Sequence, residues 1–574
     1  MIDYEIDLSD RCAHRFRVTL QVARAELPLR VSLPVWIPGS YLVREFARHL
    51  SGLSAELGGV PCRVEAIDKC SWQVHGSGRG SLRLQYEVHA FDPSVRTAYL
   101  DEDRGFFNAS SVALWVEGRE AGPHRLRIAG LPAGWQAATA MAPANRTQGW
   151  QAADYGELID HPVMLGRFWH GRFELRGVAY EFAVGGAWPG FDGDRLLADT
   201  RRICDAQIAL WHGSGRPPFS RYVFLLQALD DGYGGLEHRA STALVTARRN
   251  LPRSGQRDAG DGYVGLLGLI SHEHFHAWNV KRLKPREFEQ PDLQAENYTR
   301  LLWFFEGFTS YYDDLLLLRA GLINAPRYLR LLAKTVNAVR ATPGRLRHSV
   351  ADASFDAWIK FYRPDENTPN ATVSYYAKGS LVALALDLKL RALGRGTLDD
   401  VMRALWRAHD GGAIGEADIA RAVHAVAGRS LQRELRAWVH GTGELPLRPL
   451  LAGCGVGWAE EPGDLAAELG LRLSEGPLTG IQIKSVHRGS AAEAAGLAAG
   501  DELLAVNGWR VRRLEDARAW LQPGEPLQLL LARDQRMIYK AVAQPPASAP
   551  QVALRLADRA PAAARRRRQD WLGA

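Results

Sequence analysis

The run Ser271-His272-Glu273-His274-Phe275-His276 places two histidines and a glutamate at the spacing H-E-x-x-H. If this run is helical, about 100° per residue brings His272 and His276 onto one face about 40° apart, where both imidazoles can bind one tetrahedral metal ion. Glu273 lies beside them and would act on a water molecule as a general base. His274 points to the opposite face, and we expect it to be a hydrogen-bonded supporting or core histidine.

A catalytic zinc site needs a third protein ligand and an open fourth position. Glu306 is the single acid in the apolar, aromatic run from Leu302 to Tyr312. A buried carboxylate is costly unless it is paired or bound to a metal, so Glu306 needs a partner there, and the alternative partner is a structural salt bridge. We therefore expect one Zn²⁺ per chain, held by His272, His276 and Glu306.

The elements that must position these residues change along the chain. Residues 4–173 contain short alternating segments separated by Gly, Pro and Asp clusters, which indicates an antiparallel β domain of the sandwich type. From about residue 174 the period becomes helical, and helices are predicted over 264–282, 298–320 and 374–393. The first of these helices carries the H-E-x-x-H run, and the second carries Glu306.

The chain of 574 residues is too long for one hydrophobic core, so several domains are expected. A strand-rich region with one short helix follows the helical part, and a tail rich in Pro, Ala and Arg without an apolar period ends the chain, which favours disorder in the tail. The predicted organisation is multidomain α+β, with boundaries at 1–173, 174–455, 456–544 and 545–574.

Composition excludes several function classes. Hydrophobic residues make up 46% and charged residues 24%, the balance of a globular protein. The formal net charge is +7, but four arginines at 565–568 lie in the tail, so we expect a solvated tail and no nucleic-acid partner. No apolar run approaches the roughly 20 residues of a membrane span. An acidic start without a secretory signal and five scattered cysteines indicate reduced thiols and the cytoplasm.

Further motifs occur in order along almost the whole chain. They are Trp36-Ile37-Pro38-Gly39-Ser40-Tyr41, Tyr233-Gly234-Gly235-Leu236-Glu237-His238, the H-E-x-x-H run, Glu306-Gly307 and Tyr376-Ala377-Lys378-Gly379. With these motifs the sequence resembles the glycyl aminopeptidase family of zinc peptidases, the PDZ-bearing relatives of aminopeptidase N and leukotriene A4 hydrolase. The resemblance implies a thermolysin-like catalytic domain with a helical part over 174–455.

The resemblance also implies roles for single residues. Glu237 would receive the α-amine of the substrate, as the glutamate of G-x-M-E-N does in aminopeptidase N-like enzymes, although Leu236 and His238 replace the Met and Asn of those relatives. Gly234 and Gly235 suit an exposed strand edge that can approach a peptide backbone. Tyr376 would stabilise the oxyanion of the tetrahedral intermediate by donating a hydrogen bond.

The region 456–544 resembles a bacterial PDZ domain. The segment at 496–508 resembles its helix-to-strand connection, and Leu469-Gly470-Leu471-Arg472-Leu473 resembles its carboxylate-binding loop. Such a domain adds a peptide as an extra strand and takes the terminal carboxylate in backbone N–H groups. A packing module without a peptide ligand is the equally weighted alternative.

We therefore predict a zinc aminopeptidase that removes amino-terminal residues from short peptides. The resemblance favours Gly or Ala as the residue removed. One alternative is a zinc endopeptidase, in which Glu237 has no amine to bind. A second is a scaffold that has lost catalysis and binds peptides through its PDZ domain, against which all the expected reactive residues are present.

Overall fold

The computed structural model describes residues 1–144, 149–256, 258–544 and 551–574. These residues form two compact units. The first consists of Met1–Asn297, Arg319–Leu322 and Leu405–Ile414, and the second of Tyr298–Leu318, Ile323–Ala404 and Gly415–Ala574. Among the described helices, none combines the length and the apolar character that crossing a membrane requires.

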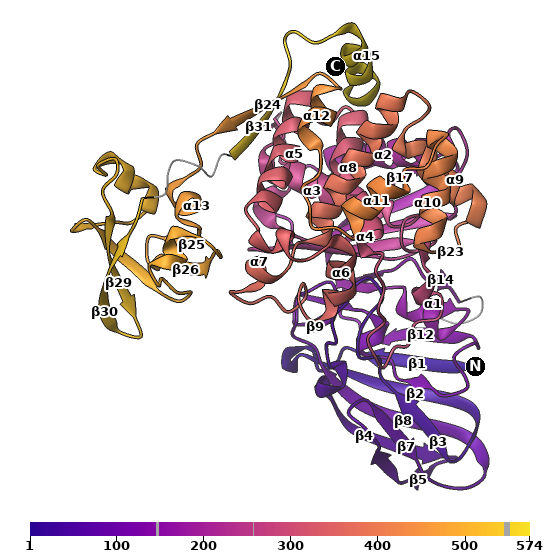
Figure 1. Cartoon of the computed structure of the whole chain (residues 1–574). Helices are drawn as coiled ribbons and strands as arrows, with labels where there is room; N and C mark the ends of the chain where they lie inside the picture. The colour runs from indigo at the N-terminus through magenta and orange to yellow at the C-terminus, as the bar shows by residue number, and fades with distance from the viewer. Residues whose placement is uncertain (145–148, 257, 545–550) are drawn as a thin grey trace. The chain divides into compact units, whose positions relative to one another are not determined.

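The amino-terminal part of the first unit is built from β-sheets (Figure 1). In the long strand β2 (Arg15–Glu26), alternate side chains from Phe16 to Val22 are buried, because successive residues of a strand face opposite sides. The largest sheet has eight strands, in the order β14 (Ala142–Pro143), β15 (Trp150–Ala152), β12 (His124–Ala129), β1 (Ile2–Asp7), β2, β8 (Arg79–His89), β4 (Leu50–Leu57) and β5 (Val60–Cys62).

Two smaller four-stranded sheets complete this β part. One has the order β13 (Gln136–Ala138), β16 (Val163–Gly166), β10 (Arg104–Phe107) and β9 (Ala98–Leu100). The other has the order β11 (Trp115–Val116), β3 (Leu29–Ser32), β7 (Ser71–Val74) and β6 (Val64–Ala66). Within the largest sheet β1 and β12 pair in parallel, and its other pairs are antiparallel. The predicted amino-terminal β domain is confirmed.

A five-stranded sheet in the same unit carries one edge of the site. Its order is β17 (Phe168–Leu175), β18 (Val178–Gly185), β19 (Arg221–Leu229), β21 (Ser241–Ala247) and β20 (Tyr233–Glu237). Strands β19 and β21 are parallel and almost entirely buried, as expected for strands covered on both faces. Strand β20 pairs only with β21 among the described residues, so it forms an edge of the sheet.

Helices α2 (Gly193–His212) and α3 (Asp261–Phe275) belong to this unit. The predicted helix over 264–282 is wrong at its carboxyl end, since α3 stops at Phe275 and His276 is its C-cap. The reason is a tight turn, in which the N–H groups of Trp278 and Asn279 both donate to the carbonyl of Phe275 and Val280 adopts φ 124°. The end of the H-E-x-x-H run is therefore fixed by a turn and not by a continuing helix.

The second unit is mainly helical. The predicted helices over 298–320 and 374–393 are found as α4 (Leu302–Arg319) and α8 (Tyr375–Leu393). The Ser374 side chain caps α8 by accepting from the N–H of Ala377, and Gly394 ends it in the left-handed conformation. Other helices of this unit are α5 (Ala325–Arg340), α7 (Thr368–Ala371), α10 (Glu416–Ala427), α11 (Gln432–Val439) and α12 (Leu447–Ala452).

The PDZ module has its own sheet and core. The six-stranded sheet has the order β25 (Leu471–Gly476), β26 (Gly480–Val486), β27 (Glu502–Val506), β29 (Leu527–Arg533) and β30 (Arg536–Val542), with the short β28 (Trp509–Arg510) paired to β27, and α13 (Leu465–Leu469) precedes it. Buried leucines, isoleucines and valines from these strands form a separate cluster. The predicted fold class, with an amino-terminal β domain, a helical catalytic domain and a carboxy-terminal PDZ domain, is confirmed.

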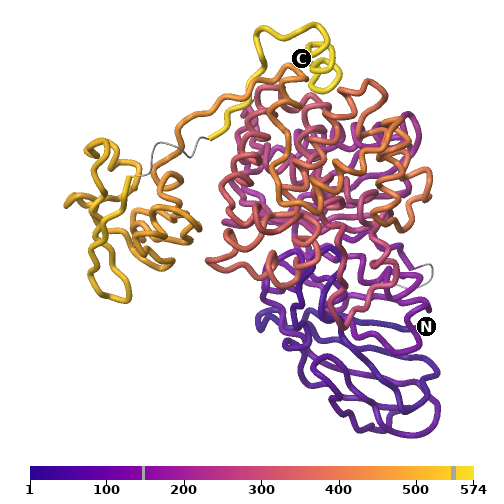
Figure 2. The backbone as a smooth tube through the Cα atoms, viewed as in Figure 1, coloured from indigo at the N-terminus to yellow at the C-terminus, as the bar shows by residue number. Residues whose placement is uncertain are grey.

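The chain enters and leaves the PDZ module through two paired strands. Strand β24 (Val456–Glu461) lies antiparallel to β31 (Gln551–Leu556), and Figure 2 shows the two segments side by side. The Asn337 side chain on α5 fixes β31, because it donates to the carbonyl of Val552 and accepts from its N–H. The module is thus inserted between two strands that are anchored to the helical unit.

The predicted disorder of the tail is wrong for 551–574, while residues 545–550 lie outside the described part of the chain. The tail forms β31 and α15 (Ala562–Leu572). Trp571 is 2% exposed and donates from its indole nitrogen to the Tyr311 hydroxyl at 3.2 Å. Arg567 and Arg568 donate to backbone carbonyls of the preceding helical region. Arg567 and Arg568 therefore hold the tail against the helical region through hydrogen bonds. A composition rich in Pro, Ala and Arg does not reveal such contacts.

Candidate active site

Helix α3 presents the two histidines of the motif. His276 is 1% exposed, and its Nδ1 lies 2.7 Å from the carbonyl oxygen of Asn279. A histidine that donates from Nδ1 to a carbonyl carries its proton on Nδ1 and has the lone pair on Nε2. Metal-binding histidines are commonly oriented in this way by a hydrogen bond from their other ring nitrogen. The rings of His272 and His276 lie with their centroids 4.6 Å apart. The turn that ends α3 therefore also fixes the tautomer of His276.

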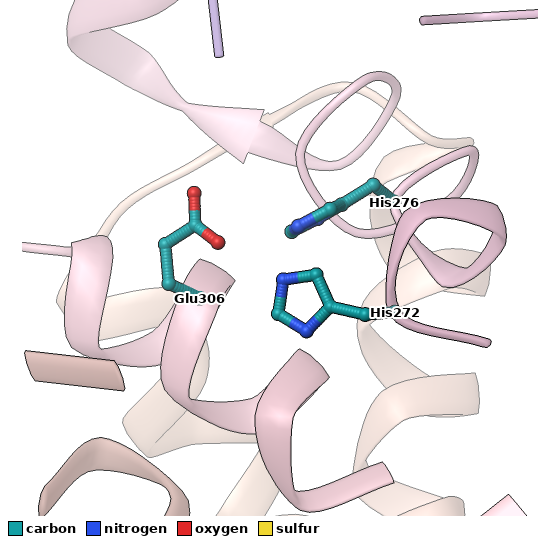
Figure 3. Close-up of side chains that lie close together, drawn as sticks. All are labelled: His272, His276 and Glu306. Carbon is teal, nitrogen blue, oxygen red and sulfur yellow. The ribbon is translucent and has the colours of Figure 1, made fainter. Parts of the chain in front are cut away.

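Glu306 on α4 is 2% exposed, and Figure 3 shows its carboxylate directed toward the two imidazoles. One ligand atom from each of His272, His276 and Glu306 lies within 4.8 Å of the others. Two imidazoles and one carboxylate form a donor set that catalytic zinc takes in proteins. The three predicted ligands are thus brought together, and the donor set fits the predicted metal.

Glu273 lies directly against the edge strand β20. A Cβ added to Gly235 would be 2.1 Å from Oε1 of Glu273, so a larger residue at this point of the strand would displace the Glu273 side chain. Glu237 follows Gly235 by two residues and therefore faces the same side. Ligand atoms of Glu237, Glu273 and His276 lie within 4.8 Å of one another. The structure thus gathers both predicted reactive carboxylates beside one histidine of the metal motif.

Glu237 is covered by the loop at 36–41. A Cβ added to Gly39 would lie 2.5 Å from Oε1 of Glu237, and Gly39 has φ 102°, where other residues are strained. Glu237 itself is 4% exposed. It also lines a cavity of about 1010 Å³ whose walls include Trp36, Tyr41 and Phe288. The segment at 36–41 therefore packs directly against this carboxylate at the wall of the cavity.

A buried charge network lies next to Glu237. His238 Nδ1 is 3.2 Å from Oδ1 of Asp160, and the Lys281 ammonium is 2.7 Å from the same oxygen. Burial lowers the pKa of His238 below its ordinary value even though Asp160 opposes the shift. Burial acts to raise the pKa of Asp160, but Lys281 and His238 hold it well below its ordinary value. His238 is thus a neutral, anchored neighbour of Glu237.

Tyr376 lies in the first turn of α8, and its hydroxyl lies 3.4 Å from the hydroxyl of Tyr362. Burial, and after it the Glu306 carboxylate, raises the pKa of Tyr376 well above its ordinary value. The phenol therefore keeps its proton, as a hydrogen-bond donor to an oxyanion must. Tyr375 is fully buried and packs against Phe361 at 4.8 Å between ring centroids.

Two glycines set the crossing of α4 and α8. A Cβ added to Gly307 would lie 2.5 Å from the Cα of Gly379, so the backbones touch where a side chain would separate them. Gly307 follows Glu306 directly, and Gly379 lies three residues after Tyr376. The glycines of both family motifs therefore let the two helices approach closely enough to hold the carboxylate and the phenol near each other.

His274 behaves as the supporting histidine that was predicted. It is fully buried, and its Nδ1 lies 2.6 Å from Oε1 of Gln207 on α2. The Gln207 amide nitrogen also donates to the Ser271 carbonyl at 2.7 Å. Gln207 thus fastens α3 from its far side.

Sequence reasoning missed four residues of this region: Arg96, Asp160, Lys281 and Tyr362. Arg96 and Asp160 are far from the motifs in sequence and carry no periodic signal. Lys281 lies in the stretch between the motif histidines and Glu306, which carries no motif of its own. The aromatic pair Phe361-Tyr362, fourteen residues before the Tyr375-Tyr376 pair, is the only local hint for Tyr362.

Family descriptions and solved structures show what this chain is similar to. The family description Peptidase M61 N-terminal domain matches residues 3–167, M61 glycyl aminopeptidase matches 265–382, and a PDZ domain matches 482–533. The chain is similar to an aminopeptidase N family protein from Idiomarina loihiensis, with 34% identity and a TM-score of 0.94 over 100% of both chains. An M1 zinc metallopeptidase from Deinococcus radiodurans is 16% identical, with a TM-score of 0.48 over 78% of this chain and 94% of its own. No curated protein matches.

Proposed function

We propose that this chain, which belongs to the M61 glycyl aminopeptidase family, removes single amino-terminal residues from short peptides with the aid of one zinc ion. The observation that carries the proposal is the position of Glu237. Its carboxylate lies beside Glu273 and His276, and Gly39 packs against it, so a buried acidic group lies next to the reactive groups. An α-ammonium bound there would pair with a carboxylate through a charge-assisted hydrogen bond.

His272, His276 and Glu306 would hold the zinc ion. When bound, zinc supplies a Lewis acid that polarises a carbonyl and acidifies water. Glu273 would take the proton from the attacking water and pass it to the leaving amine. Tyr376, which keeps its proton, would donate a hydrogen bond to the oxygen that becomes negative, an interaction stronger in the transition state than in the ground state.

The proposed preference for Gly or Ala rests on the family and not on the size of the cavity. The space of about 1010 Å³ beside Glu237 is much larger than a methyl group needs. Hydrolysis rates for Gly, Ala, Leu and Phe anilides would measure the preference directly. Similar kcat/KM values for Ala and Leu anilides would show that the cavity accepts larger side chains and would refute a strict preference.

Metal dependence is tested on the purified protein. We expect about one zinc per chain, loss of hydrolysis on chelation and its return on adding zinc. Glu273→Gln should retain the metal and lose most of the turnover, because it removes the proposed general base and leaves the three proposed zinc ligands unchanged. Full turnover in that variant would remove the general-base role of Glu273.

The endopeptidase alternative is tested by blocking the substrate amine. Alanyl peptides should be cleaved and their acetylated forms refused, because acetylation would leave the Glu237 carboxylate buried without its cation. Glu237→Ala should lower kcat/KM by about 10²-fold and reduce the discrimination. Glu289, an exposed carboxylate that lines the same cavity, gives the matched control, since Glu289→Ala should keep the discrimination. Equal cleavage of free and acetylated peptides would establish an endopeptidase.

The PDZ module is proposed to bind a peptide carboxyl terminus. Strand β25 is the edge of its sheet, and Leu469 and Leu471 are buried on either side of Gly470, which has φ 76°. A peptide could add to β25 as a further strand. Titration of the whole chain with carboxyl-terminal peptides and their amides tests this, and equal binding of acid and amide would argue against a carboxylate site.

A further inference from the structure

The free edge of β20 exposes particular backbone groups. The N–H of His238 donates to the carbonyl of Ser241 at 3.0 Å, so this pair is hydrogen-bonded across the hairpin. In an antiparallel pair, hydrogen-bonded positions recur at every second residue, so Leu236 and Gly234 also turn their N–H and C=O groups toward β21. Gly235 and Glu237 therefore turn theirs toward the free edge, where a peptide could pair with them.

Arg96 occupies this edge. It comes from the turn that precedes β9, and its Nη2 donates to the Gly235 carbonyl at 3.1 Å, while its Nη1 would lie 3.6 Å from a Cβ at Gly234. The side chain is half-buried, and within the described residues no carboxylate pairs with it. A half-buried guanidinium without a carboxylate partner is costly unless an anion joins it.

The spacing along the edge fits a short peptide. Gly235 and Glu237 are two residues apart, which is about 7 Å along a strand. The amine and the carboxylate of an extended dipeptide are separated by a similar distance, and a third residue adds about 3.4 Å, which the long arginine side chain can absorb. A peptide with its amine at Glu237 would thus bring its carboxyl end to the guanidinium within two or three residues.

We propose that Arg96 binds the carboxyl-terminal carboxylate of the substrate and so selects dipeptides and tripeptides with a free carboxyl end. This inference rests on the proposed aminopeptidase function, because Glu237 must hold the amine. Arginine suits the role because its planar fork matches a carboxylate and because it stays charged at all working pH values. Longer peptides would have to displace the guanidinium from the strand edge.

The test compares Ala-Ala with Ala-Ala-amide and with tetra-alanine on the zinc-loaded full chain. We expect kcat/KM to be at least about 10-fold higher for the free dipeptide than for its amide, mainly through KM. In Arg96→Gln this ratio should fall close to one, and Arg96→Lys should retain part of it. Arg249 is an exposed arginine paired with Asp231 just before β20, and Arg249→Gln should keep the wild-type ratio.

A second measurement does not depend on turnover. Calorimetry with the Glu273→Gln variant should show weaker binding of Ala-Ala-amide than of Ala-Ala, and adding Arg96→Gln should remove the difference. If Arg96→Gln loosens the edge strand, two results still test the role of Arg96. Equal binding of acid and amide by the Glu273→Gln chain contradicts it, and a preference for the acid that is partly retained in Arg96→Lys supports it.

The outcomes separate the two hypotheses. Hydrolysis of alanyl anilide together with equal hydrolysis of Ala-Ala and Ala-Ala-amide would overturn the role of Arg96 and leave the aminopeptidase intact. A free-acid preference that survives in Arg96→Gln would also overturn it, since another residue would then hold the carboxylate. If no substrate with a free amine were hydrolysed at all, the proposed function itself would fail.

Discussion

The close approach of the Glu273 carboxylate to Gly235 leads to a specific prediction for the variant Gly235→Ala. In Gly235→Ala the new Cβ would stand 2.1 Å from Oε1 and 2.3 Å from Cδ of Glu273, whereas ordinary contacts begin near 3.4 Å. Because φ at Gly235 is not positive, the backbone itself accepts alanine. The strain therefore arises between β20 and the Glu273 side chain. To relieve it, the Glu273 carboxylate and the strand must move apart by more than about 1 Å.

The expected loss follows from that displacement. A shift of about 1 Å in a catalytic group costs on the order of 10²-fold in rate, so Gly235→Ala should lower kcat by about that factor. Zinc content should stay near one per chain, because the three atoms nearest to the new Cβ all belong to Glu273, which is not one of the proposed metal ligands. Thermal unfolding should shift only modestly, since a strand at the edge of a sheet can yield.

The neighbouring glycine supplies the control. In Gly234→Ala the nearest atom to the new Cβ is Nη1 of Arg96 at 3.6 Å, an ordinary contact on the opposite face of the strand. Its loss of kcat should be at least tenfold smaller than that of Gly235→Ala. Alanyl p-nitroanilide turnover, metal analysis and thermal melting on both variants make the comparison. A reversed order, or full turnover in Gly235→Ala, would refute the placement of Glu273 against β20.

Three further predictions test other parts of the site. Tyr376→Phe should lower kcat by about 10²-fold with little change in KM, while the buried Tyr375→Phe should cost much less, and equal losses measured by steady-state kinetics would contradict the oxyanion role of Tyr376. Gly379→Ala would place a Cβ 2.6 Å from a backbone oxygen of α4, so it should lower the stability by about 2 kcal/mol or more in denaturant unfolding, and an unchanged midpoint would contradict the tight crossing. Joining Glu461 to Gln551 by a short turn removes the PDZ module, and the shortened protein should keep anilide hydrolysis. Ending the chain before β24 also removes α15 and should destabilise the catalytic unit. Loss of hydrolysis in the folded, zinc-loaded joined chain would show that the module completes the site.

Local sequence signals predicted the parts of the site that lie on single helices. The H-E-x-x-H run and Glu306 could be assigned because helical period and the cost of a buried acid act within a few residues. The same helical period predicted a helix that extends beyond the true end of α3. The turn at this end depends on hydrogen bonds to the carbonyls of Phe275 and Asn279, and such bonds leave no hydrophobic pattern in the sequence. Helix ends are set by such capping contacts more than by propensity.

Contacts between distant parts of the sequence could not be predicted in this way. Arg96 lies 139 positions from Gly235, and Asp160 lies 78 positions from His238. Neither pair repeats with any period, and Arg96 and Asp160, taken alone in the sequence, look like ordinary surface residues. The order of the tail could not be predicted for the same reason, because Trp571 packs against residues far away in the sequence, Tyr311 at 260 positions and Tyr328.

The family motifs share a physical feature that their reactive residues alone do not show. Gly39 lies against Glu237, Gly235 lies against Glu273, and Gly307 next to Glu306 touches the backbone of Gly379. Each of the three carboxylates is thus positioned where a side chain is missing on its own or on a neighbouring element. A glycine at such a point fixes a distance by steric exclusion and needs no bond of its own. Replacement of Gly235, where the new atom meets only the Glu273 side chain, should therefore lower turnover while zinc and melting temperature are retained. Replacement of Gly39, which has a positive φ, or of Gly307, which meets the backbone of α8, should also lower the melting temperature.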